Sequence, residues 1–133
     1  MKVEFDNSLV TGNAMIDEQH KELIGKIDKL VACCEEGGGK VEAIKMLDSL
    51  SDYTDFHFGE EEKLQEEVSY PAIEGHKAKH AEFKKSVEEL HEMLVEEEGP
   101  TDAFVAAVQK NVVDWLFDHI KNMDQALAAY VQK

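Results

Sequence analysis

Hydrophobic residues recur at helical spacing in four stretches of the chain, separated by short breaks rich in glycine or proline. Steps of three and four residues alternate within each stretch, which places the apolar side chains on one face of an α-helix. Glycine commonly ends a helix and proline commonly begins one. The breaks are residues 37–39, 68–71 and 98–101. The predicted helices cover approximately residues 17–36, 40–67, 71–98 and 101–132.

Short connections between consecutive helices favour antiparallel neighbours. We therefore predict an all-α protein in which residues 1–133 form one domain, an up-down-up-down antiparallel four-helix bundle. Residues 1–16 carry no helical pattern and are predicted to form an extended N-terminal arm.

The composition limits the possible partners. The chain has 133 residues, of which 29 are acidic and 14 basic, and its formal charge is −15. Hydrophobic residues make up 43%, too many for a disordered acidic tail. Nucleic acids and anionic membrane surfaces bind basic surfaces, so the negative charge argues against both as partners.

The sequence also indicates a compartment. Residues 1–6 lack the apolar run of a signal peptide, and no apolar stretch is long enough to cross a membrane. Cys33 and Cys34 are adjacent and cannot link distant segments, which fits a reducing environment. We therefore predict a cytoplasmic protein.

Ionisable residues interrupt the apolar stripes of the predicted helices. His57, Glu61 and His76 occupy positions where the pattern expects Leu or Val. A buried polar group costs several kcal/mol unless a metal ion or a hydrogen-bonded network compensates it. Counted along the helices at about 1.5 Å per residue, seven such residues fall at one end of the bundle. They are His20, His57, Glu61, His76, His80, His119 and Asp124.

The spacing of these residues supports a shared site. His57 and Glu61, like His76 and His80, are four residues apart and project from one helix face. His119 and Asp124 are five residues apart, about 140° on an ideal helix. Either they reach different ions, or a π-type turn brings them onto one face. All four helices contribute at one level, which favours a metal site over a structural polar network.

The donor set narrows the choice of metal. Five imidazoles and two carboxylates are too many for one tetrahedral zinc ion, whereas two ions sharing carboxylates would use them all. Calcium and magnesium prefer oxygen donors and thiolates are missing, so iron is the first candidate and manganese the second. A ferritin-like site needs two Glu-x-x-His pairs. The chain has one, Glu88 and His91, away from the other ligands.

The motifs around these residues resemble those of the hemerythrin family, in particular its single-domain bacteriohemerythrins. The resemblance extends over nearly the whole chain. The matching residues are Gly12, Ile16, Asp17, Gln19 and His20; His57, Phe58, Glu61 and Glu62; His76 and His80; and Trp115, Leu116, His119, Ile120 and Asp124. Phe5 departs from the family, whose members often have Trp in the arm.

The resemblance implies a role for each ligand. One iron ion would be bound by His76, His80 and His119, and the other by His20 and His57. Glu61 and Asp124 would bridge the two ions together with an oxo or hydroxo group. The second iron would keep an open position for reversible dioxygen binding, serving storage, delivery, scavenging or sensing.

An apolar pocket is expected around that open position, because water and protons would promote oxidation of the iron. The candidates are Leu23, Phe58, Trp115, Leu116 and Ile120, which as individuals are equally consistent with ordinary bundle core. One alternative is a di-iron oxidase or peroxidase, which would need an acid–base group that the stripes do not supply. Another is an interaction module whose metal is structural.

Overall fold

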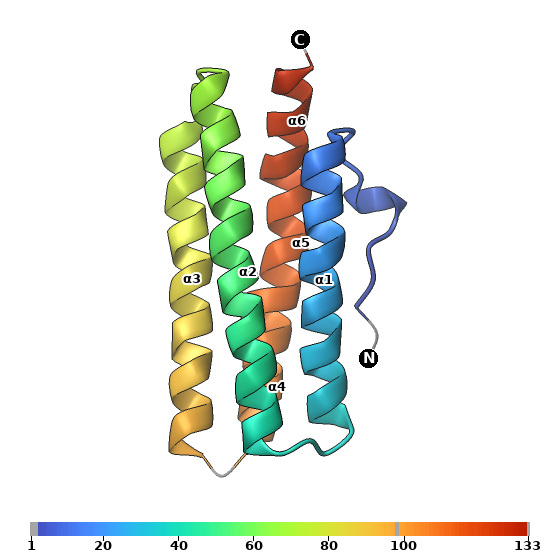
Figure 1. The fold of residues 1–133 in the computed structure, drawn as a ribbon, viewed down its shortest axis with the longest axis vertical. Helices are drawn as coiled ribbons and strands as arrows, with labels where there is room; N and C mark the ends of the chain where they lie inside the picture. The colour runs from blue at the N-terminus through green and yellow to red at the C-terminus, as the bar shows by residue number, and fades with distance from the viewer. Residues whose placement is uncertain (1–2, 98, 133) are drawn as a thin grey trace.

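The computed structural model describes residues 3–97 and 99–132, and within them it contains helices and no strand. Four antiparallel rods form the bundle (Figure 1), which confirms the predicted fold class. Three rods are the single helices α1 (Ala14–Glu35), α2 (Lys40–Glu67) and α3 (Ile73–Glu96). The fourth contains α4 (Asp102–Val108), η2 (Gln109–Asp114), α5 (Trp115–His119), η3 (Ile120–Asp124) and α6 (Gln125–Val131).

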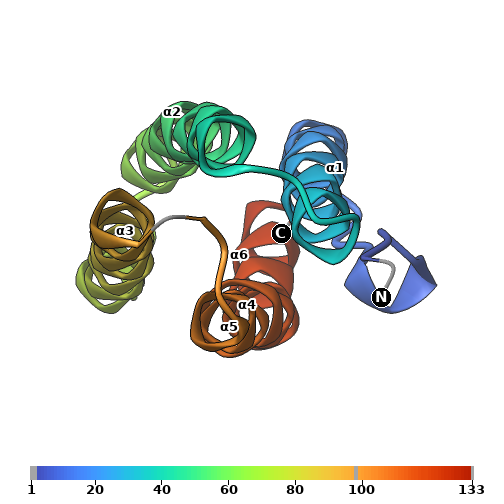
Figure 2. The ribbon, with the colours of Figure 1, turned by 90° about the horizontal axis from the view of Figure 1, so that it is seen from below.

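Each rod lies beside its neighbours in the sequence, and the fourth closes the bundle against α1 (Figure 2). The start of α1, the end of α2, the start of α3 and the end of α6 therefore share one end of the molecule (Figure 1). The rest of the interior is an apolar core built from side chains such as Leu30, Leu47, Leu90 and Val112. None of the helices in the described ranges is long and apolar enough to span a membrane.

The predicted arm extends three residues too far, because α1 begins at Ala14. The side chain of Asn13 caps this helix by accepting a hydrogen bond from the Ile16 amide at 3.0 Å, a signal that the apolar pattern does not contain. The arm includes the short 3-10 helix η1 (Asn7–Leu9) and runs along the outside of α1 (Figure 2). Asp17 holds the arm, accepting hydrogen bonds from the Thr11 amide and hydroxyl at 2.9 and 2.7 Å.

The other helix ends lie close to their predicted positions. Helix α2 covers the predicted range, and α1 ends one residue before the predicted residue 36. Helix α3 begins two residues after the predicted residue 71, because Pro71 and Ala72 belong to the preceding turn, and it ends at Glu96 rather than 98. Such differences are normal at helix termini.

The fourth rod is predicted as one continuous helix, and it differs from its prediction more than the other three rods do. Its segments η2 and η3 are π-helical, and each π turn takes in more residues than an α turn. The buried face is therefore displaced along the sequence. Ala126 is exposed, whereas Leu127 and Ala128 are buried.

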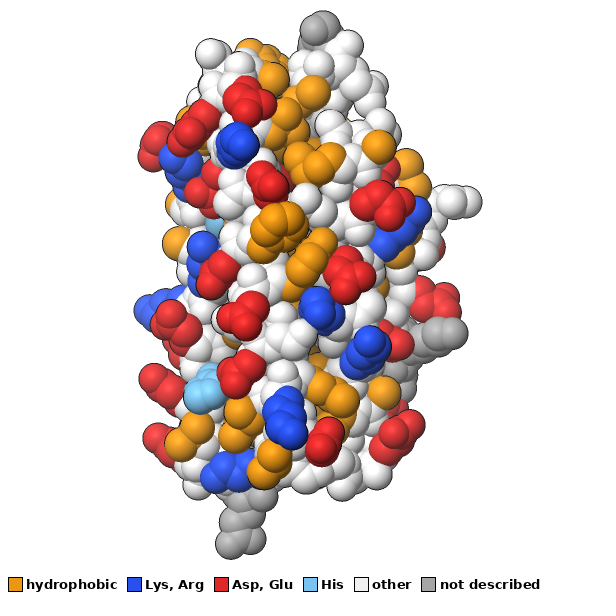
Figure 3. Space-filling view, viewed as in Figure 1, with side chains coloured by type: hydrophobic (Ala, Val, Ile, Leu, Met, Phe, Trp, Pro, Cys, Tyr) orange, Lys and Arg blue, Asp and Glu red, His pale blue; other side chains and the backbone are white. Residues whose placement is uncertain are grey.

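Charged side chains cover the outside of the bundle. On the face formed by α1, α2 and α3, acidic groups alternate with basic and hydrophobic ones rather than gathering in one patch (Figure 3). The charged side chains on this face are therefore ordinary solvated surface.

Candidate metal centre

The seven predicted ligands converge inside one end of the bundle. Helix α1 contributes one of them, α2 and α3 contribute two each, and the fourth rod contributes two. All seven side chains are buried, with at most 4% of any residue exposed to solvent. They are His20, His57, Glu61, His76, His80, His119 and Asp124.

These residues form two overlapping groups, within each of which one donor atom per residue lies within 4.8 Å of the others. The first group is Glu61, His76, His80, His119 and Asp124, and the second is His20, His57, Glu61 and Asp124. Both carboxylates belong to both groups. The arrangement therefore has the donor pattern of two neighbouring cation sites that share two carboxylates.

Each of the five clustered histidines turns its Nε2 atom toward one or both of the shared carboxylates. For four histidines the shortest Nε2–oxygen distances are 2.9 Å from His20 to Asp124, 2.8 Å from His57 to Glu61, 2.9 Å from His76 to Asp124 and 3.3 Å from His80 to Glu61. His119 Nε2 lies 3.2 Å from Asp124 Oδ1 and 3.0 Å from His76 Nε2.

Many of these close approaches are not hydrogen bonds. Both Glu61 oxygens and the Nε2 atoms of His20, His57 and His80 have no hydrogen-bond partner, although they lie within ion-pair distance of one another. Buried polar atoms without a partner cost about 1–3 kcal/mol each. Bound cations would compensate all of them at once, so the residues present fit a metal centre better than a self-contained polar network.

Two histidines are oriented by side chains outside the cluster. The Nδ1 atom of His57 pairs with Gln19 Oε1 at 2.7 Å, and that of His80 pairs with Glu62 Oε2 at 2.9 Å. These bonds fix the rings with Nε2 facing inward. The apolar pattern assigns no role to Gln19 or Glu62, although each directly precedes or follows a predicted ligand.

Replacing Glu62 with Ala is expected to lower the affinity for metal by about 10–100-fold, because the His80 ring loses its orienting acceptor. Competition with a chelator of known affinity measures this change. Glu60→Ala removes the same charge from the same helix and serves as the control. Equal affinities for the two variants would show that the Glu62 contact does not support the site.

A π turn aligns His119 with Asp124. The five residues of η3 form one π-helical segment directly after His119, and His119 Nε2 lies 3.2 Å from Asp124 Oδ1. Of the two alternatives left open by their spacing, the structure confirms the π-type turn.

The protonation of the metal-free cluster reflects its two carboxylates. Burial alone would lower the pKa of His20 and His76, but the adjacent carboxylates of Asp124 and Glu61 raise both to about 9. Burial would raise the pKa of Glu61, yet the surrounding histidines hold it well below its usual range. Without metal, protons thus supply part of the positive charge that the carboxylates require.

Metal-free protein should become less stable as the pH rises from about 6.5 to 9. His20 and His76 bind protons more tightly in the folded than in the unfolded chain, so their stabilisation is complete below about 6.5 and is lost as the pH passes 9. We expect the Tm to fall by about 5 °C or more. Calorimetry of the chelated protein across this range measures it, with zinc-loaded protein as the control. A Tm that is constant or rises would contradict the assignment.

The predicted pocket residues divide into two sets. Leu23, Phe58, Leu116 and Ile120 are fully buried, and the Phe58 ring stacks on His80 at 3.8 Å between centroids. Trp115 is only half-buried and stacks on the His119 ring at 4.6 Å, so the structure places it at the surface side of the cluster.

Gln65 is a buried polar residue that the sequence analysis missed. It lies one helical turn after Glu61, is fully buried, and neither of its amide atoms has a hydrogen-bond partner. The neighbouring apolar residue Leu64 is only partly buried. The four-residue step from His57 to Glu61, repeated once more, would have identified Gln65.

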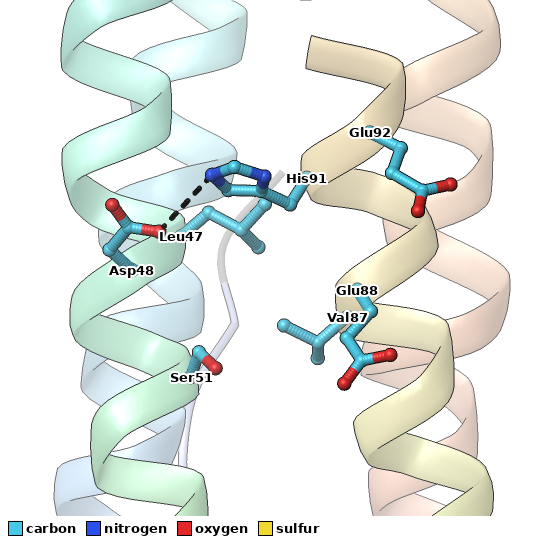
Figure 4. A pocket seen from close by; sticks show the side chains of 7 residues that line it. All are labelled: Leu47, Asp48, Ser51, Val87, Glu88, His91 and Glu92. Atoms are coloured by element: carbon cyan, nitrogen blue, oxygen red, sulfur yellow. Dashed lines mark ion pairs between the residues drawn. The ribbon is translucent and has the colours of Figure 1, made fainter. Parts of the chain in front are cut away.

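His91 lies outside the cluster. It belongs to a surface groove between α2 and α3, where its Nε2 atom is 3.5 Å from Asp48 Oδ1 (Figure 4). Leu47 and Val87 line the same groove, while Glu88 lies beside His91 on α3 (Figure 4). Within the described residues, none of the seven predicted metal ligands lines this groove.

The fold and the cluster define a helical-bundle protein with a buried histidine–carboxylate metal site. The sequence profile of the Hemerythrin HHE cation binding domain matches residues 11–131, and the chain belongs to this family, as the motifs predicted. It is similar to the bacteriohemerythrin of Stenotrophomonas maltophilia, with 31% identity over 128 residues, 96% of this chain and 80% of the relative.

Two further relatives carry the same name. The bacteriohemerythrin of Pseudomonas aeruginosa is 32% identical over 127 residues, which cover 96% of this chain and 78% of the relative. The bacteriohemerythrin of Campylobacter jejuni is 27% identical over 121 residues, which cover 91% of this chain and 89% of the relative. The range matched by the family profile, residues 11–131, contains the positions of all seven predicted ligands.

Proposed function

We propose that this chain binds dioxygen reversibly at a pair of iron ions. His76, His80 and His119 would hold one ion, His20 and His57 the other, and the two carboxylates would bridge them. The observation that carries the proposal is the pair of overlapping donor groups that share Glu61 and Asp124.

The donor set supports iron with an available binding position. Five imidazoles and two carboxylates suit iron better than magnesium or calcium, which prefer oxygen donors. When bound, a ferrous pair supplies the two electrons that dioxygen accepts. The second group contains one histidine fewer than the first, which leaves its ion fewer protein donors and more room for a small ligand.

Apolar side chains of the bundle surround the proposed dioxygen-binding position. Leu23, Phe58, Leu116 and Ile120 are fully buried and exclude water from the side of the cluster that faces the core. Outside the seven ligands, the buried polar side chains among the described residues are Thr54 and Gln65, neither of which is ionisable. An oxidase would need a proton donor close to its metal, so this composition favours binding over turnover.

Anaerobic reduction followed by cycles of air and argon tests the proposal. We expect two irons per chain, a visible charge-transfer band that forms under air, and its loss under argon without added reductant. A band that returns only when reductant is consumed would contradict reversible binding and support the oxidase alternative.

Replacing Leu116 with Ser should shorten the lifetime of the coloured state formed under air, because a hydroxyl group admits water and protons beside the cluster. Leu94→Ser makes the same substitution at a fully buried leucine near the far end of α3. Both variants should lose about 2–5 kcal/mol of stability. Equal lifetimes, measured by the decay of the visible band, would exclude Leu116 from the pocket.

A further inference from the structure

Trp115, the single tryptophan of the chain, joins a continuous cluster of rings to two of the buried ligands. Its indole stacks on His119 with the ring planes 14° apart and packs against Phe83 at 4.8 Å between centroids. Phe83 contacts Phe58 at 5.7 Å, and Phe58 stacks on His80 with the planes 1° apart. Both ligands at the end of these contacts belong to the three-histidine group.

Trp115 is the member of this ring cluster that reaches the surface. Phe58 and Phe83 are fully buried, and His80 and His119 are nearly so, whereas the indole is half-buried. It lines a surface pocket of about 240 Å³, together with Lys79, Glu82, Asp118, His119, Asn122 and Met123. A molecule in this pocket would therefore lie against the indole and beside the His119 ring, on which the indole stacks.

The other contacts that lead outward from the predicted ligands are hydrogen bonds to non-aromatic side chains. His57 and His80 pair with Gln19 and Glu62, whose side chains are saturated except at their ends. Electron tunnelling weakens steeply with distance, and the Trp115 indole lies directly on the His119 ring at 4.6 Å between centroids. Among the ring contacts of the described residues, that of His119 with Trp115 is the one that leads from a predicted ligand to the surface.

We propose that the Trp115 pocket is where an external one-electron donor reduces the metal centre. The proposal rests on the proposed function, because it requires iron that must return to the ferrous state. Each donor molecule loses one electron, which passes through the indole and His119 to one ferric ion, and two donors restore the ferrous pair. The indole couples the two sites and is not itself oxidised.

The charge around the pocket indicates the class of donor. Glu82 accepts a hydrogen bond from Trp115 Nε1 at 3.0 Å and lies 3.5 Å from Lys79 Nζ through its other oxygen. Lys79, Glu82 and the exposed Asp118 together give the rim of the pocket a net charge of −1. The whole chain carries a formal charge of −15. A positively charged outer-sphere donor is therefore attracted to this site.

Anaerobic stopped-flow reduction of the ferric protein by hexaammineruthenium(II) tests the route. The second-order rate constant should fall by at least about tenfold in Trp115→Leu and stay within about threefold in Trp115→Phe, which retains a ring. Phe56→Leu removes an exposed aromatic ring that contacts the Tyr53 ring rather than a ligand, and should leave the rate unchanged. Equal rates for all four proteins would overturn the proposal.

Two controls separate coupling from structural damage. Samples are matched for iron content, and the reduction potential of each variant is measured, since a merely structural role would change the potential along with the rate. Added salt should slow reduction of the unmodified protein, because it screens attraction between the cation and the acidic chain. A Trp115→Leu rate that falls only in proportion to its potential counts against the route.

A second readout needs no iron. In metal-free protein, the fluorescence of Trp115 should be quenched at least about tenfold more efficiently by hexaammineruthenium(III) than by hexacyanoferrate(III) at low salt. Equal quenching would show that the pocket does not select cations. This result is independent of dioxygen binding, so loss of the proposed function and loss of the electron route can be told apart.

Discussion

Replacing Glu61 with Ala should remove both metal ions from the protein. Glu61 belongs to both donor groups and lies within 3.4 Å of His20, His57, His76 and His80. Its loss takes one donor from each ion and leaves buried histidines without their anionic partner. We expect fewer than about 0.2 ions per chain by elemental analysis after loading.

Two matched variants make this result specific. Glu67→Ala removes an exposed carboxylate from the same helix, and His91→Ala removes the histidine outside the cluster. Both should retain the full metal content. A Glu61→Ala protein that keeps two ions would show that the carboxylate is not a shared ligand.

Metal loading should produce the largest change in stability. Each ion that binds only the folded chain adds about 4 kcal/mol when present at 1,000 times its dissociation constant. Two ions would therefore raise the Tm by more than about 15 °C for a chain of this size. Differential scanning calorimetry of loaded and chelated protein measures the shift.

The metal-dependent gain in Tm should shrink when a predicted ligand is removed. In His76→Ala, loading should raise the Tm by less than half of the original shift, since His76 contacts both carboxylates through Nε2. In His91→Ala, the shift should be unchanged. If chelation does not alter the Tm of the unmodified protein, the buried cluster does not bind metal as described.

The sequence was sufficient for the fold where apolar spacing and turn residues coincide. Helix α2 follows its predicted range because glycines precede it and a proline-containing turn follows it. The start of α1 depends instead on the side chain of Asn13, a local hydrogen bond that hydrophobic periodicity does not report. The fourth rod was predicted less well, because its two π-helical segments alter the period on which the prediction relied.

The convergence of the seven polar residues was predictable for a related reason. Antiparallel topology and helical rise fix which side chains share a level, whether or not their exact contacts are known. The partners of the ligands were not predictable in this way. Glu62 and Gln19 lie off the apolar stripe, and their roles depend on ring orientations that only the folded structure defines.

Trp115 illustrates the same limit. Its spacing from His119 places it one turn away, and both an interior and a surface position satisfy that spacing. The structure resolves this by stacking the indole on His119 while its Nε1 atom donates to Glu82 at the surface. A residue expected in the interior pocket therefore connects the cluster with the outside.

Anomalous diffraction from crystals of the iron-loaded protein, recorded on both sides of the iron absorption edge, tests the central claim most directly. We predict two iron peaks inside the bundle, each adjacent to Glu61 and Asp124, one with three histidine neighbours and the other with two. A single peak in the cluster, or iron bound only elsewhere, would contradict the two-ion site.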